Sequence, residues 1–278
     1  MRIAFVTDST ADIPADLCAQ YAIRVVANIL VLDGESLKDG EEISRHEFYS
    51  RLPGLSQPPT TGTASTGVYE ALYAELLASG YTHVCSIHAA AQLSGIFSAA
   101  SVAAEAFKGR VRVLDSQQLS MGLGLQVLSA AKAAQEGADL EQVTRLVQSM
   151  APRVYVIAML DTLEYIRRSG RVSWARARLG NLLRIKPFIE LRLGEVQSLG
   201  ETRTRRKGVD RLRNLLDNLA PLENLAILHT NAEQEAREFL ASLDINLQAP
   251  PPIVNVTPVI GTHVGPNGLG FAAITISS

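Results

Sequence analysis

The sequence predicts an α/β protein in which strands and helices alternate from one end of the chain to the other. Short runs rich in Val, Ile and Leu recur between longer alanine- and leucine-rich stretches of helix-forming composition. The chain has 278 residues, which is enough for about two domains of ordinary size. Because strands that alternate with helices form parallel or mixed sheets, we expect a helix-covered sheet in each half.

The first half opens with a predicted strand over Arg2–Val6, whose polar turn leads into a helix over Ile13–Gln20. A second strand is predicted over Ile23–Leu32, followed by a turn over Asp33–Gly40. Ser44 matches the first position of a capping box for the next helix. The remaining helices and strands of this half are predicted over Arg45–Leu52, Gly67–Ser79, Tyr81–Ile87, Ser98–Lys108, Val111–Leu114, Leu119–Glu136 and Leu140–Met150.

A strand predicted over Val154–Leu160 begins the second half, so we expect domains over residues 1–152 and 153–278. A short basic helix over Leu163–Ser169 ends before Gly170, a residue suited to a helix C-terminus. The other elements of this half are a helix over Trp174–Leu183, a hairpin of Lys186–Leu193 and Glu195–Leu199 turned at Gly194, helices over Val209–Leu219 and Glu233–Leu243, and strands over Leu225–His229, Ile253–Pro258 and Ala272–Ile276.

Composition excludes several classes of function. The net charge of −2 and the pI near 6.2 give no general attraction to phosphate backbones, which leaves the Arg203–Lys207 run as the only feature in favour of a nucleic-acid regulator. The two cysteines, Cys18 and Cys85, lie in no metal-ligand spacing, so we expect free thiols and no metal. No apolar run approaches membrane-spanning length and no signal peptide is evident. We therefore expect a cytoplasmic protein without an integral membrane segment.

Ser94 and Gly95 lie between a predicted strand and a predicted helix, where unpaired N–H groups at a helix start favour an anion. Ser94 read alone is equally typical of an ordinary helix cap. Thr61, in the Pro- and Thr-rich loop Leu55–Gly67, is likewise typical of an ordinary turn. Asp8 also follows a strand, and ligands of α/β sheets bind beyond the carboxyl ends of strands. With His263 in a glycine-rich loop of the second half, these residues predict a site between the domains.

Two glycines, Gly122 and Gly124, raise the alternative of a dinucleotide site. The third glycine position of that motif holds Val127, and the pair does not lie in the tight turn after a strand. Close packing of the helix against a neighbour explains these glycines better.

The chain resembles the DegV family of fatty-acid-binding proteins over almost its whole length and in the family's order. The matching segments are VTDSTADIP at Val6–Pro14, PTTGTASTG at Pro59–Gly67, QLSG at Gln92–Gly95, LDSQQLSMGLG at Leu114–Gly124, DTLEYIRRSGRV at Asp161–Val172, KPFIEL at Lys186–Leu191, ETRTRRKG at Glu201–Gly208 and IGTHVGPNGLGF at Ile260–Phe271. Two segments depart from the family pattern. Thr61–Ser65 reads TGTAS where the family has TSQPS, and Ile96 follows LSG where the family has threonine.

This resemblance implies an N-terminal three-layer α/β/α domain with a mainly parallel sheet and a C-terminal two-layer α/β domain with a mixed sheet. It also implies that a long-chain fatty acid such as palmitate lies in an apolar tunnel, with no catalytic residues and no cofactor on this chain. Thr61 and Ser94 then hold the carboxylate, with Gly95 and His263 beside it.

The resemblance further implies a partner, because proteins of this kind present the bound acid to a separate ATP-dependent fatty acid kinase that makes an acyl phosphate. Arg171, Arg203 and Arg205 are the candidate contacts to that partner or to a phosphate.

A different class of function, a serine-dependent acyl hydrolase, would use Ser94 as nucleophile. Such a serine needs a base within hydrogen-bond reach, and His88 and His263 are the candidate bases. The segment lacks the first glycine of the G-x-S-x-G turn, because Gln92 stands there. We therefore favour the binding protein.

Overall fold

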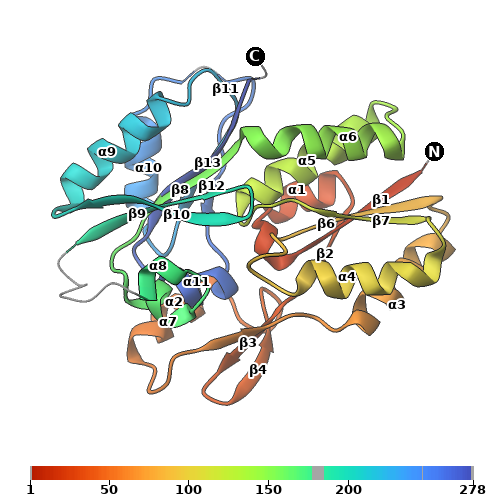
Figure 1. The fold of residues 1–278 in the computed structure, drawn as a ribbon, viewed down its shortest axis with the longest axis horizontal. Helices are drawn as coiled ribbons and strands as arrows, with labels where there is room; N and C mark the ends of the chain where they lie inside the picture. The colour runs from red at the N-terminus through yellow and green to blue at the C-terminus, as the bar shows by residue number, and fades with distance from the viewer. Residues whose placement is uncertain (1, 177–184, 246, 277–278) are drawn as a thin grey trace.

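The computed structural model describes residues 2–176, 185–245 and 247–276, which form three sheets with helices packed around them (Figure 1). The first sheet has four parallel strands in the order β2-β1-β6-β7. These strands span Ile23–Val26, Ile3–Asp8, His83–His88 and Val111–Asp115 respectively. Their parallel pairing confirms the sheet expected for the first half of the chain.

Helices cover both faces of this sheet and give the first half three layers. α3 and α4 lie on one face, and α5 and α6 lie on the other (Figure 1). The helices of this half span Ala15–Gln20 (α1), Thr66–Ala78 (α3), Ile96–Ala104 (α4), Met121–Gln135 (α5) and Leu140–Met150 (α6). Local signals fix some of their ends, since Asp139 and Gln142 form a capping box at the start of α6.

α5 packs against both halves of the molecule, which explains its two glycines. A side chain at Gly122 would lie 2.5 Å from Val156 of the second half, and one at Gly124 would lie 2.5 Å from the carbonyl oxygen of Ala11 in the first. The contacts are those of close packing, as the sequence indicated. Apolar side chains of α5 correspondingly belong to two core clusters, one in each half.

A small antiparallel sheet of three strands corrects two sequence predictions. The run Ile23–Leu32 is not one strand but two, because β3 (Ile29–Leu32) leaves the first sheet and pairs with β4 (Glu35–Lys38) and β5 (Thr60–Gly62). The expected turn Asp33–Gly40 therefore contains a strand. The break falls at Asn28, whose buried amide donates to Asp8 and Ser9. The continuous apolar run concealed this change of sheet. α2 (Arg45–Arg51) follows, with the Ser44 hydroxyl at its start as predicted.

The second half is built on a six-stranded mixed sheet in the order β10-β9-β8-β13-β11-β12. Only β11 and β12 pair in parallel. The strands span Val154–Met159 (β8), Lys186–Arg192 (β9), Glu195–Thr202 (β10), Leu222–His229 (β11), Ile253–Asn255 (β12) and Leu269–Thr275 (β13). The hairpin of β9 and β10 turns at Gly194, which confirms the predicted turn.

The helices of this sheet are α9 (Arg205–Asp217) and α10 (Glu233–Ala241), which lie together on one of its faces (Figure 1). α7 (Glu164–Ser169) ends at Gly170, whose left-handed backbone confirms the predicted C-terminal cap. The helix expected over Trp174–Leu183 is described only in its first part, as α8 (Ser173–Arg176), because residues 177–184 lie outside the described residues.

His263 does not lie in a loop, as the glycines around it suggested, but in α11 (Pro258–Val264). Pro258 stands in the first turn of this helix, where its missing N–H costs nothing. Gly261 serves close packing, because a side chain there would meet the Tyr49 hydroxyl of α2 at 2.4 Å. The glycine therefore marks a helix contact and not a turn.

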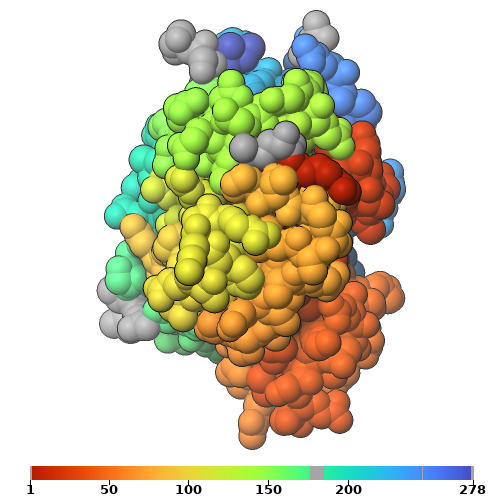
Figure 2. All heavy atoms as spheres, turned by 90° about the vertical axis from the view of Figure 1, so that its right-hand side faces the viewer, coloured from red at the N-terminus to blue at the C-terminus, as the bar shows by residue number. Residues whose placement is uncertain are grey.

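Seen from the side in Figure 2, the segment of β3 and β4 forms the lower end of the molecule, below the residues of α3 and α4. Within the described residues, no helix combines the length and apolar character needed to cross a bilayer.

Candidate functional site

A cavity of about 510 Å³ lies among β5, the loop before α4, the six-stranded sheet, α7 and α11. Its volume is in the range of small-molecule binding sites. Most of the residues that line it are aliphatic. They are Ala91, Leu93, Ile96, Leu119, Val156, Ala158, Leu160, Ile166, Val172, Ile189, Leu191, Val196, Leu228, Val256, Val259, Ile260, Val264 and Leu269.

Four residues predicted to bind a ligand, together with Arg171, line this cavity. Thr61 comes from β5, Ser94 and Gly95 from the start of α4, and His263 from α11. They are neighbours, since Thr61 contacts His263 and a side chain at Gly95 would lie 3.9 Å from Thr63. The structure therefore brings together residues from segments far apart in the sequence.

His263 is tied to Thr61 by a 3.1 Å contact between its Nε2 and the threonine Oγ1. Burial and, as a smaller contribution, the nearby charge of Arg171 together lower the pKa of His263 to about 4. The imidazole is therefore neutral at pH 7. Its Nδ1 is buried without a hydrogen-bond partner among the described residues.

These facts select the tautomer of His263. A proton on Nδ1 would leave a buried N–H donor without an acceptor, whereas a proton on Nε2 is donated to Thr61. With Nε2 protonated, the hydroxyl hydrogen of Thr61 is free to donate into the cavity. His263 thus orients Thr61 as a donor.

Ser94 both caps α4 and lines the cavity, so the two interpretations of this residue are compatible. Its Oγ accepts a 3.4 Å hydrogen bond from the backbone N–H of Ile96. The hydroxyl hydrogen is left to donate elsewhere, as at Thr61. Gly95 stands at the N-cap position of α4, and its φ is negative, as in most residues. The backbone conformation therefore does not require glycine, and the property that matters here is the absence of a side chain.

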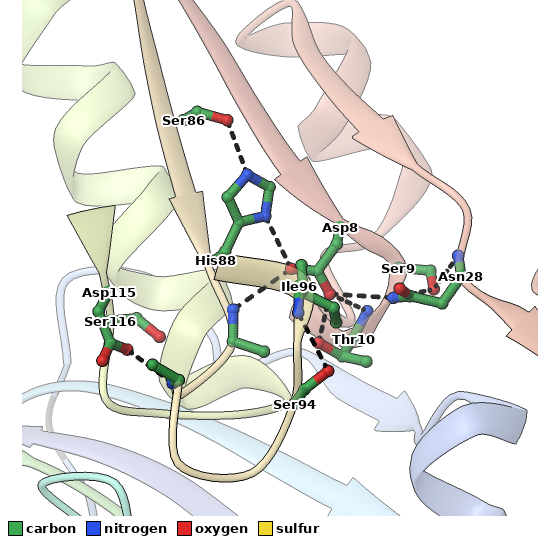
Figure 3. A network of polar contacts seen from close by, with 12 residues as sticks. Asp8, Ser9, Thr10, Asn28, Ser86, His88, Ser94, Ile96, Asp115 and Ser116 are labelled. Carbon is green, nitrogen blue, oxygen red and sulfur yellow. Dashed lines mark hydrogen bonds and ion pairs between the residues drawn. The ribbon is translucent and has the colours of Figure 1, made fainter. Parts of the chain in front are cut away.

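A buried polar network supports the loop that carries Ser94, and Figure 3 shows Asp8 at its centre. Asp8 Oδ2 contacts His88 Nδ1 at 2.9 Å and accepts from the N–H of Ala89 at 3.3 Å. His88 Nε2 lies 2.7 Å from the Ser86 hydroxyl. Asp8 and His88 are both fully buried, so the network joins the ends of β1 and β6 and does not face a substrate.

Asp8 is ionised in this network. Burial raises its pKa, but the hydrogen bond and charge of His88 and the Thr10 hydroxyl outweigh burial, and the pKa falls below its usual value. The role of His88 was missed from the sequence, although an aspartate directly after an apolar strand is a signal for such a site.

Neither candidate base of the hydrolase alternative contacts Ser94 in this arrangement. His88 is bonded to Asp8 and Ser86, and His263 is bonded to Thr61. Ser94 therefore has no histidine within hydrogen-bond reach among the described residues.

The basic residues predicted as partner contacts lie in different surroundings. Arg171 lines the cavity with an exposed side chain. Arg203 is exposed and stands just before α9, away from the cavity wall. Arg205 is bound internally, because its Nε donates to Glu235 of α10 at 2.8 Å and its Nη1 donates to the carbonyl of Asn267 at 2.6 Å. Arg205 thus ties α9 to α10.

Among the described residues, no group of His, Cys, Asp and Glu side chains is arranged to hold a metal ion.

The fold and the cavity define a three-sheet α/β protein with an apolar pocket whose wall carries a cluster of hydroxyl groups. The model of the DegV family, described as a family of uncharacterised proteins, matches residues 2–275. The chain belongs to the DegV family.

Relatives and solved structures agree over the whole chain. A DegV domain-containing protein of Caldanaerobacter subterraneus is 34% identical over 275 residues, which cover 97% of each chain. A structure of a DegV family protein from Thermus thermophilus, described by its fatty acid binding, has a TM-score of 0.91 and 32% identity and covers 99% of this chain and 100% of its own. DegV from Bacillus subtilis, described as a fatty acid binding protein, has a TM-score of 0.87 and 30% identity, covering 99% and 100%.

Proposed function

We propose that this protein binds one long-chain fatty acid such as palmitate, with the carboxylate at Thr61 and Ser94 and the tail along the aliphatic wall. The observation that carries the proposal is a 510 Å³ aliphatic cavity whose wall includes two hydroxyls free to donate. The description of two relatives as fatty acid binding proteins supports the choice of ligand. The acid lies between domains that we take as residues 1–152 and 153–278.

The chemistry of the wall matches the two ends of such a ligand. A carboxylate accepts hydrogen bonds, and Thr61, Ser94 and the guanidinium of Arg171 are donors. Gly95 leaves room for the head group beside Thr63. His263 acts through Thr61, whose hydroxyl it orients. The rest of the wall is suited to methylene groups, which make no directed contacts.

The tail supplies most of the affinity in this proposal. Burying roughly fourteen methylenes at about 0.8 kcal/mol each sets an upper limit near 11 kcal/mol. Each hydrogen bond to a charged carboxylate contributes about 1.5–3 kcal/mol. The head group therefore mainly fixes the orientation of the acid, and tail length decides how tightly it binds.

The test is to measure the affinity of delipidated protein for octanoate and palmitate by calorimetry. Palmitate should bind far more tightly, because eight further methylenes enter the cavity. Equal affinities for the two acids would refute a buried tail. Mass spectrometry of lipid extracted from the purified protein then identifies the acid that it carries.

The protein acts as a carrier in this proposal and performs no chemistry itself. A separate ATP-dependent fatty acid kinase in the cytoplasm phosphorylates the bound carboxylate, and the basic residues near α9 and α7 dock against an acidic face of that kinase. Arg203, Arg206 and Lys207 are exposed and suit this role. Arg205 suits it less, because Glu235 already neutralises its charge.

A further inference from the structure

α11 belongs to the second half, lines the cavity and packs directly against the first half. It packs against α7 of its own half and against α2, β3 and β5 of the other. It contributes Val259, Ile260, His263 and Val264 to the wall. A shift of α11 relative to β5 would therefore move His263 away from Thr61 and change the shape of the cavity.

Two buried aspartates of the first half hold the residue that begins this helix. The N–H of Thr257 donates to Asp12 Oδ1 at 2.9 Å, and the Thr257 hydroxyl donates to Asp39 Oδ2. Asp12 and Asp39 are 2% and 3% exposed, and Thr257 is 2% exposed. Thr257 stands at the N-cap position of α11, so the two carboxylates fix where the helix starts. We call these three residues the Thr257 joint.

The two carboxylates of the joint have one neighbouring cation, Arg45. Arg45 Nη2 lies 3.1 Å from Asp12 Oδ1, and its guanidinium also donates to the carbonyl of Asn255. Asp39 is satisfied on one side by the Ser9 hydroxyl, at 2.6 Å, but its Oδ1 has no hydrogen-bond partner among the described residues. When both aspartates are ionised, one buried negative charge is uncompensated, which is costly in a dry interior.

The other titratable groups around the joint do not supply the missing positive charge. Tyr49 of α2 is neutral, because burial raises its pKa well above the usual value. Asp8 is near enough for its negative charge to raise the pKa of Asp39 further. His229 of β11 is close enough to Arg45 to feel its charge, but burial lowers the pKa of His229 and keeps it neutral at pH 7.

The closed joint therefore binds protons more tightly than an open one. Burial raises the pKa of Asp12 from 3.8 to about 6, against the lowering effects of Arg45 and Ser120, and burial also raises the pKa of Asp39. The Ser120 hydroxyl donates to Asp12 Oδ2 at 2.6 Å; when Asp12 is protonated, this hydroxyl can rotate and accept a hydrogen bond from the carboxyl O–H. If opening exposes Asp12 to water, protonation stabilises the closed joint, and ionisation as the pH rises through about 6 favours opening.

We propose that Asp12 and Asp39 are positioning residues of the cavity, which hold α11 through Thr257 and whose surplus negative charge makes the Thr257 joint the place where the cavity opens. The release of fatty acid at this joint rests on the proposed function. The motion of α11 does not, since it follows from the charges and hydrogen bonds of the protein alone.

The first experiment measures amide hydrogen exchange of peptides covering residues 257–264 in protein without added fatty acid, between pH 5 and pH 7.5. Exchange rates are divided by the intrinsic rates of the same peptides at each pH. The pKa of Asp12 is about 6 in the closed joint, and we take the ordinary value of 3.8 for the open joint. With these two values the corrected exchange rate should rise at most about tenfold from pH 5 to pH 7. α6 serves as a reference, because it lies away from the joint and should show no such step.

The Asp12→Asn variant removes the charge and keeps the shape. Its peptide 257–264 should be protected at pH 7 at least as strongly as the wild type is at pH 5, with the pH step reduced to the contribution of Asp39. A pH step of undiminished size in Asp12→Asn, or no step in the wild type, would overturn the proposal.

Thr257→Val removes the hydrogen bond to Asp39 and should raise exchange of peptide 257–264 at every pH. Thr257→Ser keeps the hydroxyl and should therefore exchange at the wild-type rate. Equal exchange in both Thr257 variants would also overturn the proposal.

The second experiment measures the release of palmitate from the same proteins into phospholipid vesicles at pH 7. Asp12→Asn should release palmitate more slowly than the wild type, by at most about 150-fold, the factor set by the pKa values of about 6 and 3.8. Thr257→Val should release it faster. A change in exchange without a change in release would show that the cavity opens elsewhere, contrary to the proposal. If palmitate does not bind at all, the proposed function fails, while the exchange result still decides the role of the joint.

Discussion

At the scale of single residues, the head-group end of the cavity depends on which way two hydroxyl hydrogens point. His263 donates to Thr61 and so turns the threonine hydroxyl toward the cavity, and the N–H of Ile96 occupies one lone pair of Ser94 and leaves its hydrogen free. In the proposed complex, these two donors on separate segments converge on one carboxylate. Their effects on binding are expected to depend on each other.

The Thr61→Ala and Ser94→Ala variants test this dependence. Each should lower fatty-acid affinity by about 1.5–3 kcal/mol, the contribution of a hydrogen bond to a charged group. The double variant should lose less than the sum, because a carboxylate released by one hydroxyl also shifts away from the other. Calorimetric titration with palmitate measures all four proteins in one double-mutant cycle.

Two controls separate the charge contact from the shape of the loop. Thr60→Ala changes the neighbouring threonine of β5, which does not line the cavity, and should leave affinity unchanged. Hexadecanol carries no charge and should be nearly indifferent to the loss of either hydroxyl. Equal sensitivity of acid and alcohol would mean that Thr61 and Ser94 shape the wall and do not hold the carboxylate.

The sequence pointed to Thr61, Ser94 and His263 because they stand in recognisable segments after predicted strands. It did not point to the joint of Asp12 with Thr257 or to the pair of Asp8 with His88. Each of these contacts joins residues far apart in the chain, and nothing in the sequence distinguishes a buried aspartate from an exposed one. Only the fold shows which carboxylates lose water and find partners.

At the scale of elements, the sequence was reliable where a local signal fixes an end and unreliable where packing decides. Capping residues and turn glycines, such as Ser44, Gly170 and Gly194, correctly marked helix ends and a hairpin. The run Ile23–Leu32 was predicted as one strand, because no local signal shows that its second part joins another sheet. The segment around His263 was predicted as a loop, because the sequence does not show that Gly261 packs closely against α2.

Two arginines near the start of α9 carry the same charge but lie in different surroundings. Arg203 is exposed, whereas Arg205 is part-buried against Glu235 of α10. If the proposed kinase docks here, Arg203→Glu should slow its formation of acyl phosphate while leaving palmitate affinity and stability unchanged, since exposed charges act mainly on association. Kinase assays at several salt concentrations, with calorimetric titration in parallel, measure both effects.

Arg205→Glu is the matched variant from the same helix start. It places a second carboxylate against Glu235 and should lower the free energy of unfolding by about 1–3 kcal/mol, because it breaks a hydrogen-bonded pair and adds repulsion. A loss of palmitate binding in Arg203→Glu would place that arginine in the pocket. Unchanged kinase kinetics in Arg203→Glu would remove it from the docking surface.

At the scale of the whole molecule, the cavity is a shared property of both halves. Its wall takes Thr61, Ser94 and Ile96 from the first half and Val156, Ile189 and Leu269 from the second. α5 packs between the same two halves through Gly122. A fatty acid that contacts both walls is an additional link between them, so its binding energy should resist their separation.

Two intrinsic probes report the halves separately. Trp174, the single tryptophan, follows α7 in the second half, and its indole N–H donates to Val196 of β10 at 3.0 Å. Cys85 is fully buried on β6 in the first half, and burial raises the pKa of its thiol to about 12, so it reacts only when the sheet opens. Cys18→Ser removes the other thiol and provides the background for labelling.

In this background, palmitate at about 100 times its dissociation constant should raise the unfolding free energy seen by both probes by about 2.7 kcal/mol. Urea titrations followed by Trp174 fluorescence and by thiol labelling of Cys85 should then give coincident midpoints, because neither half can unfold without losing the ligand. At the same palmitate concentration, the variant lacking both the Thr61 and Ser94 hydroxyls binds more weakly and should show smaller shifts in both signals. A shift seen by Trp174 alone would mean that the second half holds the acid without the first, which is incompatible with a carboxylate bound to β5 and to the start of α4.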